Sequence, residues 1–298
     1  MMKKDDFPEG INFINKDGRR IISAEHNKYL EGVFLATQLN CNGFYLKADS
    51  FSQTQQVNID FSLLDRVRSI DELAIGPNIK FSPDQDFSPL YALSKLTSLT
   101  IHVKGISIDF NRFSKLTNLT ATYSKKFSNF SALTNLRNLW LWHLNTNDFG
   151  FFGDFPNLRE LKITQSQIRS LDGLSGCENL EKLHLIRCTK LLNLSGIDAL
   201  KKLNGVFIIN SKQMVNFSCL KGNCSIEQLG LNRVDSLDFI RYMPNLKTVG
   251  FDELIDGNIA LALEIPHIER ITFYPNKKHY THTQQEVNEI IARRRLSA

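Results

Sequence analysis

The side chains in this sequence that are best suited to acid–base chemistry are His184, Glu160 and Lys162. An imidazole beside a carboxylate and an ammonium group has the composition of a proton-transfer site. Catalysis of this kind needs a pocket that excludes water, so that charge developing in the reaction is stabilised. The repeat pattern described below places these residues on an open sheet surface without such a pocket. We therefore predict no catalytic residues and no enzyme activity.

The histidines and cysteines lack the spacing of a metal site. His279 and His282 flank two residues, but a metal needs three or four ligands and the sequence offers no second pair at a suitable distance. The five cysteines are an odd number without CxxC spacing, which favours reduced thiols over a disulfide framework. The sequence also has no GxGxxG, GxxxxGK[ST], HExxH or GxSxG motif. It predicts neither a cofactor nor a metal centre.

Charge and hydropathy exclude further classes of function. The net charge is +5, with 36 basic residues scattered among 31 acidic ones, which is not typical of a nucleic-acid-binding protein. The one basic run, Arg293 to Arg295, falls in the last turn of a predicted helix, where cations favour the negative helix end. No apolar run is long enough to span a membrane, and the first residues lack the apolar core of a secretory signal. We expect a cytoplasmic protein with no nucleic-acid or membrane partner.

The two tryptophans of the chain lie together in the stretch 138-NLWLWHLN-145. Trp140 and Trp142 alternate there with Leu139 and Leu141. Successive side chains of a strand point to opposite faces, so the two leucines share one face and the two indoles share the other. The neighbouring sequence decides which of these faces is buried.

The stretch belongs to a repeat in which apolar residues occupy the first, fourth, seventh and ninth positions. The seventh position recurs ten times between Leu73 and Ile271, and the nine intervals cover 198 residues, a mean of 22. Each unit of such a repeat buries its apolar residues against the units before and after it. Leu139 and Leu141 hold the seventh and ninth positions of one unit, so we predict that they are core and that the indoles face outward.

Segments such as 158-LRELKI-163 and 180-LEKLHL-185 resemble the motif of the leucine-rich repeat family. The resemblance covers residues 61 to 275, and the repeat length is similar to the short bacterial type of internalin-like proteins. It implies an α/β solenoid, a horseshoe with a parallel β-sheet on the concave face and short helical, 3-10 or extended segments on the convex side. The family places asparagine three residues after the last strand leucine. Here that column is mostly serine, cysteine and aliphatic residues, so we expect less regular turns.

Both ends of such a stack need a cap, because an end repeat would otherwise leave apolar surface and a strand edge in water. Residues 11–22 surround Lys16-Asp17-Gly18 in the pattern of a β-hairpin, and 43-GFYL-46 reads as a degenerate first strand. At the other end Thr283 and Glu286 form a capping-box pattern that opens a helix. The predicted division is an N-terminal cap over residues 1–60, about ten repeats over 61–275 and a C-terminal capping helix over 276–298.

The outward columns of the sheet are small and polar at both ends and apolar in the middle. Contiguous apolar area is rare on a soluble monomer, and aromatic residues edged by charge are typical of protein-binding hot spots. An alternative is that a long loop or the N-terminal segment covers this face. The residues predicted to bind a partner are Trp140, Trp142, Glu160, Lys162, Lys182, His184, Ile186, Phe207 and Ile209.

We therefore expect a non-enzymatic protein that grips a partner protein with its concave face. A solenoid of this kind resembles immunity proteins that neutralise bacterial toxins. The alternative is a regulatory scaffold subunit of an intracellular enzyme such as a phosphatase. Tight binding to a toxin encoded upstream would indicate the first role, and weaker reversible binding to a housekeeping enzyme the second. We expect a monomer.

Overall fold

The structure, a computed structural model, describes residues 7–49 and 56–296 of the 298-residue chain. Its contacts group the chain into two compact units, residues 1–139 and 140–298, and each is described by itself. Strand β9, Asn138–Trp142, includes the last two residues of the first unit and the first three of the second.

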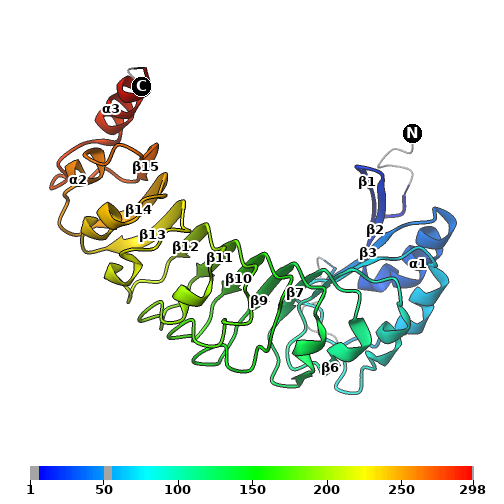
Figure 1. Ribbon diagram of the computed structural model, residues 1–298. Helices are drawn as coiled ribbons and strands as arrows, with labels where there is room; N and C mark the ends of the chain where they lie inside the picture. The colour runs from blue at the N-terminus through cyan, green and yellow to red at the C-terminus, as the bar shows by residue number, and fades with distance from the viewer. Residues whose placement is uncertain (1–6, 50–55, 297–298) are drawn as a thin grey trace. The chain divides into compact units, whose positions relative to one another are not determined.

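The first unit holds a sheet that begins with an antiparallel hairpin and continues in parallel strands (Figure 1). Strands β2, β3, β4, β5 and β7 pair in that order, and β6 and β8 form a separate two-stranded ladder. The elements are β1 Ile11–Lys16, β2 Arg19–Glu25, η2 His26–Lys28, α1 Tyr29–Gln38, β3 Gly43–Lys47, η3 Phe61–Arg66, β4 Glu72–Ile75, η4 Ser88–Ala92, β5 Ser98–Ile101, β6 Ile108–Asp109, η5 Phe110–Phe113, β7 Asn118–Thr122, β8 Phe127–Ser128 and η6 Phe130–Ala132.

The predicted hairpin and the degenerate first strand are both present in this unit. Asp17 and Gly18 have φ values of 52° and 76°, and this left-handed pair is what a two-residue hairpin turn requires. Helix α1 was not foreseen. Gly32 allows α1 to approach the sheet closely, because a Cβ at this position would lie 2.6 Å from the Cβ of Ala24.

The second unit continues the parallel pattern through strands β10 to β15, which lie side by side in sequence order (Figure 1). Short 3-10 segments and one turn of α-helix connect several of the strands. The elements are β10 Glu160–Thr164, β11 Lys182–Ile186, η7 Ile197–Ala199, β12 Gly205–Ile209, η8 Ser218–Leu220, β13 Gln228–Val234, η9 Asp238–Tyr242, β14 Thr248–Leu254, α2 Ala260–Leu263, β15 Arg270–Phe273 and α3 Gln284–Leu296.

The core lies on the leucine side of the sheet, as predicted. Leu139 and Leu141 are 2% and 0% exposed. The seventh positions stack in register from strand to strand, with Leu161 beside Leu183 and Leu183 beside Val206. Phenylalanines such as Phe149, Phe152 and Phe217 fill the space beneath the connecting segments and are fully buried. The predicted fold class, an α/β solenoid of leucine-rich repeats, is confirmed.

The turn after the strand is regular in four consecutive repeats, contrary to expectation. The residues that follow β9, β10, β11 and β12 are His143, Gln165, Arg187 and Asn210, and all have φ between 54° and 59°. In the first three of these turns the N–H group donates to the last strand carbonyl of the next repeat, at 2.8–2.9 Å. The prediction that losing the asparagines makes the turns irregular is therefore wrong for these repeats.

Serine and cysteine replace the family's asparagine in these turns. Ser166 and Ser211 are buried, and the Ser166 hydroxyl donates to the carbonyl of Leu144 at 2.9 Å. The Ser211 hydroxyl accepts the N–H of Cys188 at 3.0 Å. Each of these side chains therefore links one turn to the turn of the preceding repeat, at the position where the family places asparagine.

Asparagine forms a second ladder on the other side of the strands, in the turn that precedes each strand. The side-chain amides of Asn135, Asn179 and Asn245 each donate to a main-chain carbonyl in the turn of the preceding repeat, at 2.9, 2.6 and 2.7 Å. The sequence carries this ladder as Asn-Leu pairs, one of which lies within 133-LTNL-136. The repeats are thus tied together before and after the strands.

The C-terminal helix α3 closes the second unit as predicted. Thr283 and Glu286 form the capping box, with a Thr283 N–H to Glu286 carboxylate distance of 2.7 Å. Val287 and Ile291 are buried. Arg294 reaches three main-chain carbonyls of the preceding repeat, including that of Ile265 at 2.9 Å, so this part of the basic run anchors the cap.

Candidate protein-binding face

The predicted binding residues lie on four successive strands, on the side of the sheet opposite the leucines. We call this surface of β9 to β12 the aromatic face. In register, Lys162, His184 and Phe207 form one row across β10, β11 and β12, and Thr164, Ile186 and Ile209 form the next. Trp140 and Trp142 lie on β9, and Glu160 and Lys182 begin β10 and β11. The spacing of strands makes the face about 15 Å wide.

The two indoles form a single cluster at one side of the face. Their ring centroids are 5.1 Å apart with an interplanar angle of 31°. The Trp140 Nε1–H donates to the hydroxyl of Thr164 on the neighbouring strand, at 2.8 Å. Thr164 is only 4% exposed, so this hydrogen bond fixes the orientation of the Trp140 ring from below.

A cation covers the outer side of this cluster. The ammonium group of Lys162 lies 4.7 Å from the centroid of the Trp140 ring, within the range of a cation–π contact. The same ammonium group is 3.8 Å from the carboxylate of Glu160. Lys162 therefore has two electrostatic partners, and its hydrocarbon stem extends the apolar surface of the indoles.

A second aromatic pair lies two strands away. The rings of His184 and Phe207 stack with centroids 4.7 Å apart and an interplanar angle of 16°. Phe207 can lie flat because glycines flank it. A Cβ at Gly230 would come within 2.9 Å of the Phe207 ring, and one at Gly205 within 3.0 Å. The sequence thus leaves space on the sheet that the Phe207 ring fills.

Burial lowers the pKa of His184 below its ordinary value of 6.5, and the positive charges of Lys162 and Lys182 lower it further. Glu160 acts in the opposite direction, with its carboxylate 3.5 Å from the His184 Nε2. Burial and the two lysines outweigh the carboxylate. His184 is therefore uncharged at neutral pH, and its ring acts as an aromatic surface.

The indoles point to the predicted side of the sheet but are less exposed than expected. Trp140 and Trp142 are half-buried, because each ring leans on the other and Lys162 covers Trp140. Phe207 and Ile186 are also half-buried, whereas Ile209 is 40% exposed. The face is a packed aromatic layer with open patches of ring and aliphatic surface.

Three features of this face were not predicted from the sequence. Thr164 orients Trp140, and the glycines at 205 and 230 accommodate Phe207. Arg187 follows β11 directly, is exposed, and adds a positive charge beside Ile186. The register of the repeat places each of these residues in or next to a column that already contained a predicted residue, but it does not show the contacts that their side chains make.

The titratable groups of the face form one small set. The Glu160 carboxylate lies 3.5 Å from the His184 Nε2 and 3.8 Å from the Lys162 ammonium group. Among residues 7–49 and 56–296 no group of three or more His, Cys, Asp or Glu side chains is placed to hold a metal ion. The five cysteines are free, and burial raises the pKa of Cys177 and Cys188 to about 12, which keeps both thiols protonated.

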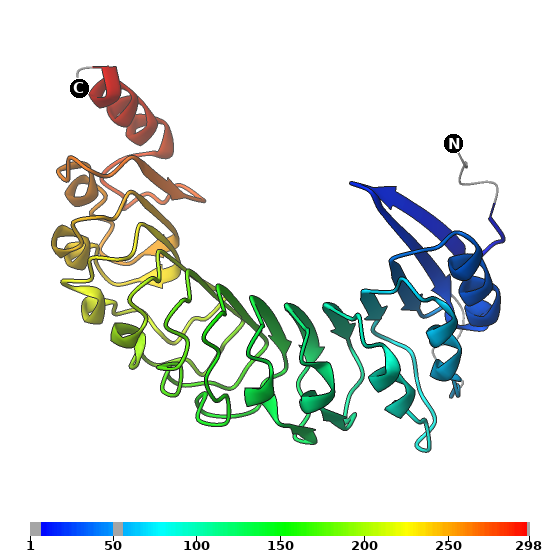
Figure 2. The ribbon, with the colours of Figure 1, turned by 45° about the vertical axis from the view of Figure 1, so that its right-hand side comes forward.

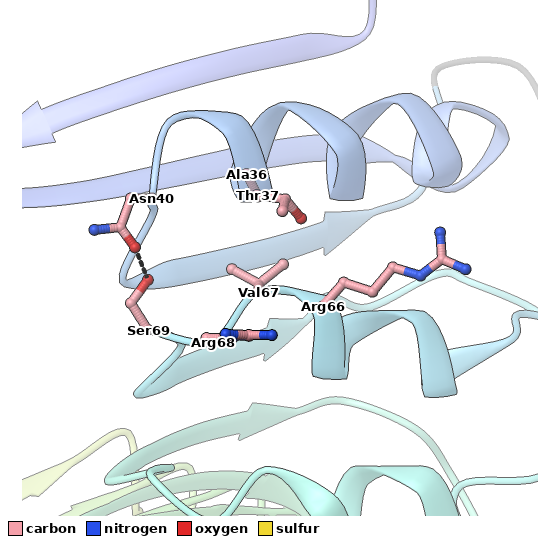
Figure 3. A pocket seen from close by; sticks show the side chains of 7 residues that line it. All are labelled: Ala36, Thr37, Asn40, Arg66, Val67, Arg68 and Ser69. Atoms are coloured by element: carbon pink, nitrogen blue, oxygen red, sulfur yellow. Dashed lines mark hydrogen bonds between the residues drawn. The ribbon is translucent and has the colours of Figure 1, made fainter.

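A hollow of about 490 Å³ lies in the first unit between the end of α1 and the turn before β4 (Figure 3). Its hydroxyl groups are used within the fold. Thr37 donates to the carbonyl of Val33 at 2.8 Å, and Ser69 lies 2.7 Å from the carbonyl of Cys41 and 2.9 Å from the Asn40 side chain. The Thr37 bond lies within α1, and the two Ser69 bonds join the segment after α1 to the turn before β4, so we assign the hollow a structural role.

In the described part of the chain, no helix has both the length and the hydropathy to cross a lipid bilayer.

Comparison with solved structures gives fold-level similarity to bacterial leucine-rich repeat proteins. The functional domain of InlJ from Listeria monocytogenes is 19% identical, with a TM-score of 0.45 over 72% of this chain, which spans about half (53%) of that domain. The internalin inlF from Listeria monocytogenes is 14% identical, with a TM-score of 0.42 and coverage of 79% of this chain and 82% of that one.

A leucine-rich repeat protein of Leptospira interrogans is 12% identical, with a TM-score of 0.33 and coverage of 89% of this chain and 85% of that one. No family model matches the sequence, and no curated protein does either.

Proposed function

We propose that the aromatic face binds a partner protein and that this binding, rather than catalysis, is the function of the chain. The observation that supports it is the layer of six large apolar or aromatic side chains on one sheet face, held in place by its own contacts. The residues are Trp140, Trp142, His184, Ile186, Phe207 and Ile209.

The layer is pre-organised, which favours tight binding. The Thr164 hydroxyl fixes Trp140, and the stack on His184 fixes Phe207. Side chains that are already ordered lose little rotamer entropy when a partner binds. The turns that follow β9, β10, β11 and β12 also share one backbone conformation, with φ between 54° and 59°. A partner therefore meets a rigid surface in which its own apolar groups can be buried.

The charges around the layer indicate an acidic partner surface. Lys182 and Arg187, at opposite ends of β11, form no ion pair with any residue that the structure describes. They place one basic residue at the start of β11 and another directly after its end. Carboxylates of the partner at these two positions would steer its approach and set its orientation.

The experiment is an affinity capture from the source organism with three forms of the protein. These are the native chain, the double variant Trp140→Ala with Trp142→Ala, and the control Ile255→Ala, which removes an exposed isoleucine away from the face. The captured partner is then titrated by calorimetry. We expect the double variant to weaken binding on the order of a hundredfold or more, because hot-spot anchors contribute about 2 kcal/mol each. Equal binding by the double variant and the control would contradict the proposal.

For the particular role, we propose neutralisation of a toxin, by analogy with immunity proteins of similar architecture. This role requires very slow dissociation and loss of the partner's activity in the complex. A regulatory subunit of an intracellular enzyme would instead show faster exchange and altered rather than abolished activity. Measuring the dissociation rate and the activity of the captured partner together separates the two roles.

A further inference from the structure

The first strand of the first unit, β1, is an open edge. It pairs with β2 on one side and stands at the end of the strand order, and two views show it at the outer end of that unit (Figures 1 and 2). The hairpin pairs Lys16 with Arg19, and the Glu25 N–H donates to the Gly10 carbonyl at 2.9 Å. Backbone groups of alternate residues face the same side of a strand, so even-numbered residues of β1 face β2.

The backbone groups of Phe13 and Asn15 consequently point away from β2. Neither residue's N–H group donates to any residue in the described part of the chain, whereas the outward N–H of Ile11 is satisfied by the Pro8 carbonyl at 3.0 Å. An edge of this kind is a template for another strand. Two consecutive outward positions are therefore available for pairing.

The last strand of the sheet, β15 in the second unit, has its outward backbone groups covered. There the side-chain amide of Gln284 covers the outward backbone of β15. It accepts the N–H of Phe273 at 2.7 Å and donates to the carbonyl of Ile271 at 2.9 Å. This chain thus protects its last strand with a side chain from α3, and no described residue gives β1 equivalent protection.

Residues 11–15 of β1 also lack the usual defences of an edge, and the only charged residue of the strand is Lys16 at its end. Residues 11–15 include no charged residue and no proline, which are the common means of blocking edge-to-edge pairing. Ile14 is 38% exposed. The hairpin is fixed in place, because Arg19 at its turn forms ion pairs with Asp71 and with Glu72, the latter at 3.0 Å. The free edge of β1 therefore belongs to a hairpin whose position is fixed by these ion pairs.

We propose that β1 pairs antiparallel with β1 of a second copy of this chain, about a two-fold axis at Ile14. This register places Phe13 opposite Asn15 of the second copy, and Asn15 opposite Phe13, so both outward residues of each chain form hydrogen-bonded pairs. The Ile14 side chains of the two copies meet in the intervening pair, where strands approach most closely. Centring the pairing on Phe13 would instead leave Ile14 opposite Asn12.

The test is the molar mass of the purified protein, measured by sedimentation equilibrium across the micromolar range. We expect the native chain to approach twice its mass of 34.1 kDa with rising concentration, in place of the monomer expected from the sequence. Ile14→Lys puts two ammonium groups opposite each other and should keep the protein monomeric. Asn15→Pro removes an outward N–H that the hairpin does not use and should have the same effect. Ile255→Lys, at an isoleucine with 42% exposure, is the matched control and should dimerise like the native chain.

Circular dichroism of each variant checks that the fold is retained, and Ile14→Val should dimerise normally. A native protein that stays monomeric at all concentrations would overturn the proposal. So would dimers that survive both edge substitutions, and in that case loss of the dimer in Ile209→Lys would assign it to the aromatic face. A native monomer that dimerises only after removal of residues 1–6 would assign the edge to the chain's own N-terminus.

Discussion

The hydrogen bond between Trp140 and Thr164 determines how the first indole of the aromatic face is presented, and its free energy can be isolated. Trp140→Phe removes the N–H donor and keeps an aromatic ring, and Thr164→Val removes the acceptor without changing the shape of the side chain. The donor–acceptor distance is 2.8 Å and Thr164 is 4% exposed. A hydrogen bond of this kind contributes about 1 kcal/mol to the free energy of unfolding.

Each single variant should lose that contribution, and Trp140→Phe should also lose part of the contact with Trp142. In the double variant the hydrogen bond is lost only once. We therefore expect the two single losses to exceed the loss in the double variant by about 1 kcal/mol. Urea denaturation followed by circular dichroism measures all four proteins without relying on tryptophan fluorescence.

Additivity would refute the proposed coupling. If the two single losses add up to the loss in the double variant within about 0.3 kcal/mol, the residues are not coupled. The indole would then not be held by Thr164, and the pre-organisation argued for the binding face would lose its main support. Thr164→Ser is a control that keeps the hydroxyl acceptor and therefore the hydrogen bond. The losses in Thr164→Ser and Trp140→Phe should add up to the loss in their double variant within about 0.3 kcal/mol.

Three further predictions concern the same region. Burial and the neighbouring lysines lower the pKa of His184, so its contribution to the free energy of unfolding is complete above pH 6.5 and is lost as the pH falls below that value. His184→Gln should therefore flatten this part of the stability–pH profile, measured by urea denaturation. Ser211→Ala leaves the buried N–H of Cys188 without its acceptor and should cost about 1–3 kcal/mol in the free energy of unfolding, and a loss below about 0.5 kcal/mol would mean that the serine ladder is unimportant. Gly230→Ala places a methyl group against Phe207 and should push that ring off His184. The pKa of His184 should then rise toward 6.5 in an NMR titration, and an unchanged pKa would show that the stack does not bury the imidazole.

The repeat period was enough to predict the strands and the buried face. Leu139 and Leu141 could be assigned to the core because apolar residues recur at fixed positions in ten units, and burial of one face fixes the register of a strand. The capping box at Thr283 and the hairpin turn at Asp17 were predictable for a different reason. Both are local patterns whose residue types satisfy specific backbone groups.

Helix α1 was harder to predict from the sequence. Its buried residues Tyr29, Val33 and Ala36 have helical spacing, but exposed Leu30 and Phe34 obscure the pattern. A sequence pattern does not show which of several apolar residues a neighbouring strand will cover.

The division into a cap over residues 1–60, repeats over 61–275 and a cap over 276–298 remains a prediction.

For the binding face, the sequence placed the right side chains on one surface but not their contacts with each other. The distance of 5.1 Å between the two indole rings, and the resulting half-burial of Trp140 and Trp142, depend on side-chain rotamers. Alternation along a strand predicts only the face to which a residue points. The serine and cysteine rungs, such as Ser211, were missed because the family pattern drew attention to asparagine alone.

Trp140 and Trp142 are the only tryptophans in the chain, so tryptophan fluorescence reports on the aromatic face and nothing else. The most direct test of the proposed binding role is therefore acrylamide quenching of this fluorescence, measured for the free protein and for its complex with the captured partner. The partner in this complex must lack tryptophan or carry it only as a non-fluorescent analogue. We predict that binding shifts the emission to shorter wavelength and decreases the quenching constant, because the partner removes the exposed parts of both rings from water. An emission maximum and a quenching constant that stay unchanged in a saturated complex would show that the partner binds elsewhere, and would contradict the binding role proposed for the aromatic face.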